Sequence, residues 1–221
     1  MKGLAQLWRE LRYRPAGLGG LDLKLRQHLP LDGGFFIEAG ANDGKTQSNT
    51  YLFEKRWGWR GLLVEPLPHL AELCRISRSR SIVEQVALVP FDFAGSEIEM
   101  RDVNLMSLVK GAMKSEAEEL AHVHAGEAVQ HLRSRELRVP VATLESLLVK
   151  HRVGQIDLLS LDVEGFELSV LRGLDLEKRL PANLLIEARY REEIDRYLAP
   201  LYQPVAELSH HDVLYQPRRA R

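Results

Sequence analysis

The alternation of short apolar segments with helix-forming segments, which begins at Gly34, constrains the fold more than any other feature. Such alternation is typical of βαβ units and of a mostly parallel sheet. Two alternating segments close the chain and predict an antiparallel hairpin. We therefore expect an α/β fold with a seven-stranded, mostly parallel sheet. The predicted strands are 35–40, 61–66, 81–88, 156–162, 182–190, 204–210 and 212–217. Helices are expected at 46–56, 68–77 and 191–200 and within 138–150. A further helix is expected after the strand 156–162, and it extends through Leu171.

The chain of 221 residues is long enough for one such domain with a sizeable core. Residues 1–30 are expected to form an N-terminal helix and a flexible connector, and residues 31–221 the main domain. An insert interrupts the alternation at residues 100–135. Residues 91–100 favour a hairpin. Residues 113–135 are polar and rich in helix formers, which leaves a helical insert, a lid and a disordered loop open.

The charge is balanced, with 30 Lys and Arg residues against 31 Asp and Glu residues, so the net charge of -1 gives no overall reason to bind nucleic acid. No apolar stretch approaches the roughly 20 residues that span a bilayer, and the N-terminus lacks the apolar region of a signal peptide. We therefore expect a cytoplasmic protein whose single cysteine, Cys74, is a small buried side chain. The helix predicted over residues 2–14 is basic and carries Trp8, which leaves weak contact with an anionic membrane surface open.

Residues 35–50, FFIEAGANDGKTQSNT, contain the letters GKT behind an apolar strand, as a phosphate-binding P-loop does. A P-loop reads G-x-x-x-x-G-K-[ST], and the spacing of Gly40 and Gly44 is one residue too short for it. Glu38 at the end of the strand would also repel phosphates. The dinucleotide fingerprint G-x-G-x-x-G fails too, because Asn42 stands where its second glycine belongs. An NTPase or a kinase is therefore the weaker alternative.

The pattern that is present, Glu38-x-Gly40-x-Asn42-x-Gly44, suits a ligand that lacks phosphate and carries a cation near Glu38. Asn42 tolerates left-handed backbone, so the loop can turn sharply. S-adenosylmethionine meets these demands, because its ammonium can pair with Glu38 and its carboxylate can face N–H groups where the next helix begins. Glu65 ends the second strand, which is where α/β nucleoside sites place the acid that holds the ribose.

Four segments resemble FkbM-type methyltransferases, and the resemblance extends over most of the chain, from Phe35 to Tyr215. They are FIEAGANDGKTQSNT, GLLVEPLP, LLSLDVEGFELSVLRG and LLIEARY, of which the DVEG and GAN-x-G elements are quite specific. The resemblance implies a Rossmann-like class I methyltransferase sheet and S-adenosylmethionine as the donor. Characterised members methylate hydroxyl groups on sugars or on polyketide-type natural products. Many members have a lysine before DVEG where this chain has Ser160 and Leu161, so no role of that lysine carries over.

Carried over residue by residue, the resemblance places the methionine end of the cofactor at the loop after the first strand. Glu65 would hold the ribose, and Ala87 at the third strand would contact the adenine. The cofactor-binding residues that we predict are Glu38, Gly40, Ala41, Asn42, Gly44, Ser48, Glu65, Pro66 and Ala87.

Methyl transfer to a hydroxyl needs a group that takes the acceptor proton. Asp162 and Glu164 follow the fourth core strand, at its mouth beside the donor's sulfonium. Alternation along an extended chain would put both carboxylates on one side, flanking Val163. His210 and His211 are adjacent, so at most one of them faces the pocket, and His211 is the further candidate for the base.

A metal site is not part of the prediction, although three carboxylates could hold a hard cation such as Mg²⁺ if one binds. Those carboxylates belong to Asp162, Glu164 and Glu187, which end neighbouring strands. We expect solvated side chains for His122, His124 and His131.

The predicted function is thus S-adenosylmethionine-dependent O-methyl transfer to a small molecule or a glycan, with a sugar hydroxyl as the expected acceptor. Two other classes stay open. One is a P-loop-like NTPase or kinase, and the other is a catalytically silent methyltransferase fold that binds a partner. The sequence does not name the acceptor or the oligomeric state, nor does it decide whether a metal takes part.

Overall fold

The computed structural model describes residues 8, 10–29 and 32–218 of the chain. The strands of its larger sheet are, in spatial order, β10 (Tyr202–Glu207), β11 (Asp212–Pro217), β9 (Leu184–Glu187), β8 (Leu158–Leu161), β1 (Phe35–Ala39), β2 (Arg60–Val64) and β3 (Ile82–Glu84). The strands from β9 to β3 are parallel neighbours. β11 runs antiparallel to β9 and forms a hairpin with β10. The predicted α/β fold with a seven-stranded, mostly parallel sheet is therefore confirmed.

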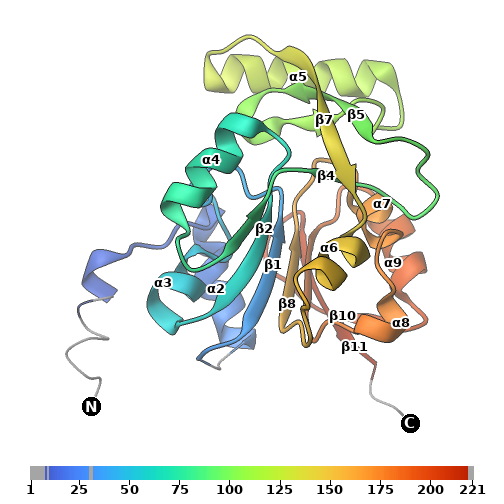
Figure 1. The fold of residues 1–221 in the computed structure, drawn as a ribbon. Coiled ribbons are helices and arrows are strands. Elements are labelled where there is room, and N and C mark those ends of the chain that lie inside the picture. Colours follow the sequence, from blue (N-terminus) through green and yellow to red (C-terminus); the bar gives the residue numbers. More distant parts are fainter. Residues whose placement is uncertain (1–7, 9, 30–31, 219–221) are drawn as a thin grey trace.

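Helices cover both faces of this sheet (Figure 1). They are α2 (Leu21–His28), α3 (Tyr51–Trp57) and α4 (Pro68–Ser77) on one face, and α6 (Leu144–Lys150), α7 (Glu167–Leu171), α8 (Leu176–Arg179) and α9 (Arg191–Leu198) on the other. Successive strand residues point to opposite faces. Phe36 therefore packs with the first group of helices, and Ile37 and Ala39 with the second. The carboxyl end of β1 lies between these two layers and leads directly into the loop that begins at Gly40.

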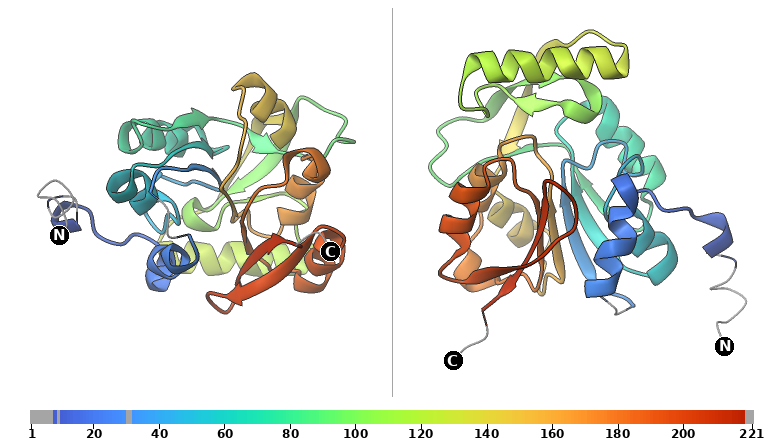
Figure 2. Two further views of the ribbon diagram at one scale, coloured as in Figure 1. Left: turned by 90° about the horizontal axis from the view of Figure 1, so that it is seen from below. Right: turned by 180° about the vertical axis from the view of Figure 1, so that it is seen from behind.

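A second sheet lies beyond the carboxyl ends of the parallel strands (Figures 1 and 2). Its strands are, in order, β4 (Ala87–Leu88), β7 (Arg135–Ala142), β5 (Glu97–Asp102) and β6 (Leu108–Val109). The helix α5 (Glu116–Gln130) crosses its outer side, and the Ser115 hydroxyl caps it by accepting the N–H of Glu118 at 3.2 Å. The insert is thus a structured cap over the end of the main sheet.

Two local predictions are wrong in this region because strand partners far along the chain decide the pairing. The hairpin predicted within residues 91–100 does not form, since β5 pairs with β6 and β7 instead. The third predicted strand, residues 81–88, is divided between the two sheets. β3 pairs with β2 in the larger sheet, whereas β4 pairs with β7 in the smaller one.

The predicted N-terminal connector contains a helix that belongs to the core. After a short 3-10 turn (Leu18–Gly20), α2 presents Leu21, Leu25 and then Leu29 to the sheet, and all three are buried. Burying one such side chain stabilises the fold by about 1.5–3 kcal/mol. Most of the helix predicted over residues 2–14 lies outside the described residues.

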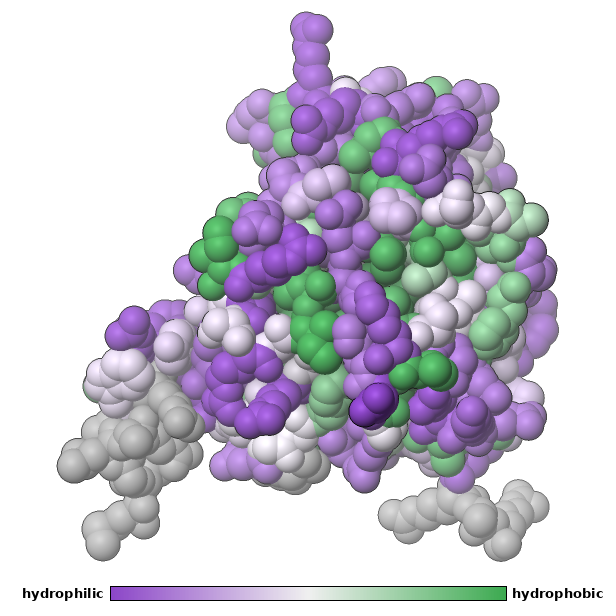
Figure 3. Space-filling view, viewed as in Figure 1, coloured by the Kyte–Doolittle hydropathy of each residue, from purple (hydrophilic) through white to green (hydrophobic). Residues whose placement is uncertain are grey.

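The helix α4 has the amphipathic pattern of a surface helix. Cys74 is buried, as predicted, whereas Leu73 and Ile76 are exposed. Figure 3 shows hydrophobic side chains reaching the surface over this helix. Over the described ranges, no helix combines the length and the hydropathy that crossing a membrane requires.

Candidate active site

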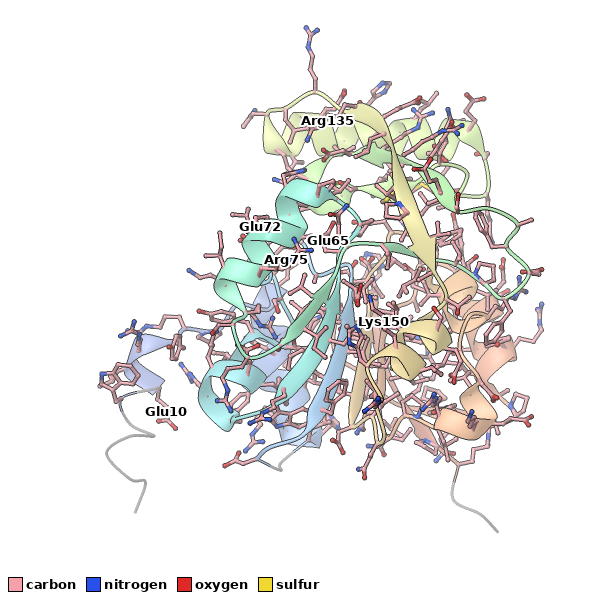
Figure 4. All side chains as sticks on the ribbon, in the orientation of Figure 1. Glu10, Glu65, Glu72, Arg75, Arg135 and Lys150 are labelled. Carbon is pink, nitrogen blue, oxygen red and sulfur yellow. The ribbon has the colours of Figure 1, made fainter. Side chains whose placement is uncertain are left out.

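A pocket of about 920 Å³, its open mouth included, lies where the carboxyl ends of β1, β2 and β8 meet the second sheet. Open α/β sheets bind their ligands at this edge. Figure 4 places Glu65 there, at the end of β2 and beside α4. All but one of the predicted cofactor-binding residues line this pocket, namely Glu38, Gly40, Ala41, Asn42, Ser48, Glu65, Pro66 and Ala87.

The exception is Gly44, which is required for packing and does not line the pocket. Its φ is +76°, and a Cβ there would lie 2.7 Å from the Ser77 hydroxyl and 2.8 Å from Cγ of Arg78. The glycine therefore allows the loop to contact the end of α4, which supports the pocket from outside.

Glu38 is buried, and its carboxylate is already engaged by the protein. The Ser48 hydroxyl lies 2.9 Å from both carboxylate oxygens, the Thr50 hydroxyl donates at 2.6 Å and the Asn49 N–H donates at 2.9 Å. The Arg78 guanidinium adds an ion pair at 3.2 Å. These contacts give Glu38 a positioning role, since it holds the loop of residues 46–50, and they do not support the predicted pairing with the ammonium of the cofactor.

Arg78 completes this network, and sequence analysis did not identify it. Its side chain is fully buried and pairs with Glu54 at 3.0 Å as well as with Glu38. It also donates to the Gly44 carbonyl at 2.9 Å and to the Thr50 hydroxyl at 2.8 Å. Removing one partner of a buried ion pair costs about 3–5 kcal/mol. The pocket wall therefore depends on an arginine whose local sequence, RISRSR, is typical of a solvated helix end.

The loop that contains GKT is not a phosphate cradle. The N–H groups of residues 40–41 donate to the Val64 carbonyl at 3.1 and 3.3 Å. Those of residues 45–46 donate to the Asp43 carboxylate at 2.8 and 2.6 Å. Phosphate binding by a P-loop requires backbone N–H groups that point at the ligand. Since these are already used within the loop, the interpretation as a P-loop NTPase is wrong.

The helix after this loop begins at Tyr51, later than the predicted start at Thr46. The Ser48 hydroxyl accepts the N–H groups of Tyr51 at 3.0 Å and of Thr50 at 3.3 Å. The N–H groups of Thr50 and Tyr51 are therefore occupied. A contact of these two groups with the carboxylate of the cofactor is not supported.

Glu65 follows β2 and connects two parts of the pocket. Its carboxylate accepts the Asn42 N–H at 2.8 Å and the Leu67 N–H at 2.9 Å. Asn42 adopts φ of +48°, so the left-handed turn predicted for it is present. Burial raises the pKa of Glu65 to about 7, although the two N–H donors act in the opposite direction. A carboxylate oxygen can accept a second hydrogen bond, so Glu65 can also hold ribose hydroxyls.

The opposite end of the pocket is apolar and comes mainly from β4 and the second sheet. Its side chains are Val86, Ala87, Leu88, Met100, Val109 and Phe166. Such a wall suits the flat, weakly polar face of an adenine. The insert also connects to the loop after β1, because the Asn42 side chain donates to the Asn104 side chain at 3.2 Å. Sequence analysis left a lid open for residues 113–135 but did not predict that residues 100–109 line this pocket, since nothing in their local pattern shows which loop they pack against.

The turn after β8 brings the two predicted catalytic carboxylates to the pocket. The chain leaves the strand at Asp162 and turns, with φ of +54° at Glu164 and +96° at Gly165. The buried Glu167 carboxylate holds this turn by accepting the N–H groups of Val163 at 3.2 Å and Gly165 at 2.9 Å. The extended alternation predicted here is wrong, but Asp162 and Glu164 do line the same pocket.

Three carboxylates gather beside this turn. Oxygens of Asp162, Glu164 and Glu187 all lie within 4.8 Å of one another. Burial raises the pKa of Asp162 well above its usual value, and the charges of Glu187 and Glu164 raise it further. Water reaches Asp162 through the pocket, but the surrounding protein limits its hydration. Burial and Glu187 raise the pKa of Glu164 to about 8, and the Arg189 guanidinium at 3.2 Å lowers it.

His122 of α5 also reaches this group, so its predicted solvent exposure is wrong. The side chain is buried, and its Nε2 lies 3.1 Å from the Met106 carbonyl and 3.4 Å from Glu164. Arg189 faces its Nδ1 at 3.3 Å. A neutral imidazole that donates from Nε2 and accepts at Nδ1 fits these contacts, and burial lowers the pKa of His122 accordingly. The other two histidines of the insert are exposed, as predicted.

A second pocket of about 810 Å³, its open mouth included, adjoins the first between α2 and the insert. Its lining residues are Leu18, Leu21, Gln47, Asn49, Leu105, Met106, Val129, Gln130, Asp162, Glu164, Glu187 and Asp212. His211 lines neither pocket. Its exposed ring lies against that of His210, with the ring centroids 4.6 Å apart, in the turn before β11. The geometry therefore does not support His211 as a base.

Three solved structures resemble the chain at low sequence identity. A TehB-like S-adenosylmethionine-dependent methyltransferase from Corynebacterium glutamicum is 11% identical, with a TM-score of 0.44 over 97% of this chain and 96% of that one. A candidate S-adenosylmethionine-dependent methyltransferase from Methanococcus maripaludis is 8% identical, with a TM-score of 0.44 over 91% and 85%. A fibrillarin/Nop5p complex is 11% identical, with a TM-score of 0.42 over 85% and 73%. No curated protein sequence matches the chain.

The family comparison extends over most of the chain. The methyltransferase FkbM domain matches residues 38–214, from Glu38 near the end of β1 to Leu214 in β11. That range contains the acidic residues that line the two pockets and all of the predicted cofactor-binding residues. The chain belongs to the FkbM methyltransferase family, and it is an S-adenosylmethionine-dependent methyltransferase.

Proposed function

We propose that the protein transfers a methyl group to a hydroxyl of a sugar or glycan. The observation that carries this proposal is the pair of adjoining pockets. They share Gln47, Asn49, Leu105, Asp162 and Glu164. A donor in the first pocket and an acceptor in the second would meet at these side chains. The second pocket is rich in carboxylates and amides, which suit a ligand with many hydroxyl groups.

The first pocket fits S-adenosylmethionine in its chemistry. Its lining combines the loop after β1, the Glu65 carboxylate and an apolar wall. Gly40 lets the loop pack directly on the turn after β8, because a Cβ there would overlap the Asp162 carbonyl. Glu65 would hold the ribose, and the apolar wall around Ala87 would contact the adenine. The loop of residues 46–50, which Glu38 shapes, would surround the methionine end.

S-adenosylmethionine supplies an already activated methyl group, so the protein has to align the acceptor oxygen and take its proton. We assign the proton to Asp162, which lies where the two pockets join. A base positioned there contributes roughly 10²–10⁴-fold. Glu164, which Arg189 holds at 3.2 Å, would bind neighbouring hydroxyls of the acceptor.

Replacing Glu65 with alanine should weaken cofactor binding about tenfold to a hundredfold. A hydrogen bond from a hydroxyl to a charged carboxylate is worth roughly 1.5–3 kcal/mol. Calorimetry with S-adenosylhomocysteine measures the change. Glu72→Ala is the matched control, since that glutamate is exposed on α4. An unchanged affinity in Glu65→Ala would contradict the role in ribose binding.

Binding of the nucleoside part should depend on pH through the same residue. The pKa of Glu65 is about 7, and the ionised carboxylate is the better acceptor for ribose hydroxyls. Binding should therefore strengthen as the pH rises through 7 and level off above it, and the dissociation constant should rise up to about tenfold per pH unit below 7. Calorimetry with methylthioadenosine, which lacks a titratable amino acid part, checks this. Glu65→Gln should show a flat profile, and a flat profile in the wild type would contradict the expectation.

The acceptor class can be tested by screening sugars and glycans with donor labelled in its methyl group. NMR of the labelled product would locate the methyl group. We expect label on a hydroxyl oxygen of a sugar. Transfer to nitrogen or carbon, or transfer only to acceptors without sugar, would refute the proposed acceptor while leaving the methyltransferase activity in place.

A further inference from the structure

The carboxylates of Asp162, Glu164 and Glu187 have the arrangement of a ligand set for one cation. They come from the ends of the neighbouring parallel strands β8 and β9, and one oxygen of each lies within 4.8 Å of the others. Oxygens bound at roughly 2.1–2.5 Å to a single divalent ion lie up to about 4.2–5 Å apart. The three oxygens can therefore reach a common ion with little movement.

A second observation at the same place points to a ligand. The Asn49 side chain is only 6% exposed, lines both pockets together with Asp162 and Glu164, and has an Oδ1 with no hydrogen-bond partner in the described part of the chain. Oε2 of Glu187 is likewise buried without a partner there. Leaving a buried polar atom unpaired costs about 1–3 kcal/mol. Both of these unpaired atoms are oxygens, which are the atoms that hard cations bind.

The charges around the cluster are not balanced by the protein. Among the ion pairs that the structure defines, Arg189 supplies a permanent positive charge to Glu164. His122 lies 3.4 Å from the same carboxylate, but its contacts fit a neutral imidazole. Asp162 and Glu187 have no ion pair within the described ranges, and Asp212 adds a further carboxylate to the pocket. A divalent cation would offset this excess of negative charge.

We propose that Asp162, Glu164 and Glu187 bind a hard divalent cation, such as Mg²⁺, Mn²⁺ or Ca²⁺, in the region of the pockets that Asn49 also lines. Each carboxylate has two oxygens, so Asp162 can contribute one to the ion and keep the other for the acceptor. A second consequence rests on the proposed function: an ion here would bind acceptor hydroxyls and lower their pKa.

Titration of cofactor-free protein with Mn²⁺, followed by electron paramagnetic resonance of the free ion, tests this site directly. We expect one Mn²⁺ per chain, which Mg²⁺ or Ca²⁺ displaces and which EDTA removes. Glu187→Gln should weaken Mn²⁺ binding at least about tenfold, because one charged ligand is lost. Glu177→Gln, a matched change at an exposed position of α8, should bind like the wild type.

Thermal unfolding of the same samples shows whether the variants are folded. Without metal, Glu187→Gln should be at least as stable as the wild type, because it removes like-charge repulsion. At the same Mn²⁺ concentration, the melting temperature should rise more for the wild type and for Glu177→Gln than for Glu187→Gln. Absence of Mn²⁺ binding by the wild type, or unchanged binding by folded Glu187→Gln, would refute the site. Calorimetry with S-adenosylhomocysteine on these samples tests the donor pocket separately, so failure of the metal site and failure of the proposed function can be distinguished.

Discussion

Replacing Gly40 with alanine is expected to weaken binding of S-adenosylmethionine at least about a hundredfold, which corresponds to about 2.7 kcal/mol. Two effects combine. Gly40 has φ of +79°, a left-handed conformation that costs other residues roughly 1–2 kcal/mol. An added Cβ would also overlap the carbonyl oxygen of Asp162, which is backbone and cannot rotate away. The loop and the turn after β8 would have to separate, and both line the pocket.

Gly58→Ala is the matched control for this change. Gly58 ends α3 with φ of +73°, but nothing lies within 4 Å of the position of an added Cβ. This variant should lose about 1–2 kcal/mol of stability and keep its affinity for the cofactor. Calorimetry with S-adenosylhomocysteine, together with thermal unfolding, separates the two effects. If folded Gly40→Ala binds like the wild type, the close packing of the loop on the turn does not shape the site.

The strands of the main sheet could be anticipated because their sequence signal is local. Apolar strands such as β1 and β8 are continuous in the sequence, and their connections are helices of ordinary length. The carboxyl ends of parallel strands meet at one edge, so Glu38, Glu65 and Asp162 could be placed at one pocket before any coordinates. The same reasoning brought Glu187 to that edge.

Residues whose role depends on distant partners could not be anticipated. Arg78 is buried because Glu38 and Glu54 are there to receive it, and neither lies near it in the sequence. His122 lies in a helix whose polar sequence predicts solvent exposure, yet its side chain contacts Met106 and Glu164. The local sequence around each of these two residues describes its own segment but does not show which distant residues that segment contacts.

Glu38 shows how a residue can be placed correctly while its hydrogen bonds are not anticipated. An acid that ends the first strand was rightly placed at the pocket. The partners of its carboxylate could not be predicted, because Ser48, Thr50 and Arg78 come close enough to bind it only in the folded loop. The sequence therefore predicted that Glu38 lies at the pocket, but it did not predict the hydrogen bonds that Glu38 makes within the protein.

Replacing Asp162 with asparagine should lower turnover at least about a hundredfold, within the range that a positioned base contributes. Asparagine keeps the size of the side chain and leaves the backbone bond from the Asp162 N–H to the Ala39 carbonyl, at 3.2 Å, in place. It removes the charge and the basicity. The affinity for S-adenosylhomocysteine should therefore change little, and Asp92→Asn, a matched change in an exposed loop, should turn over normally.

Glu164→Gln allows the two carboxylates to be told apart. Arg189 already holds Glu164, so its charge is partly offset and it is the poorer base of the pair. We expect this variant to raise KM for the acceptor more than it lowers kcat, whereas Asp162→Asn should act mainly on kcat. Equal effects on kcat would mean that the two residues act as one unit, as ligands of a common cation would. Normal turnover of Asp162→Asn would place the base elsewhere in the second pocket, where Asp212 is the remaining carboxylate outside the cluster.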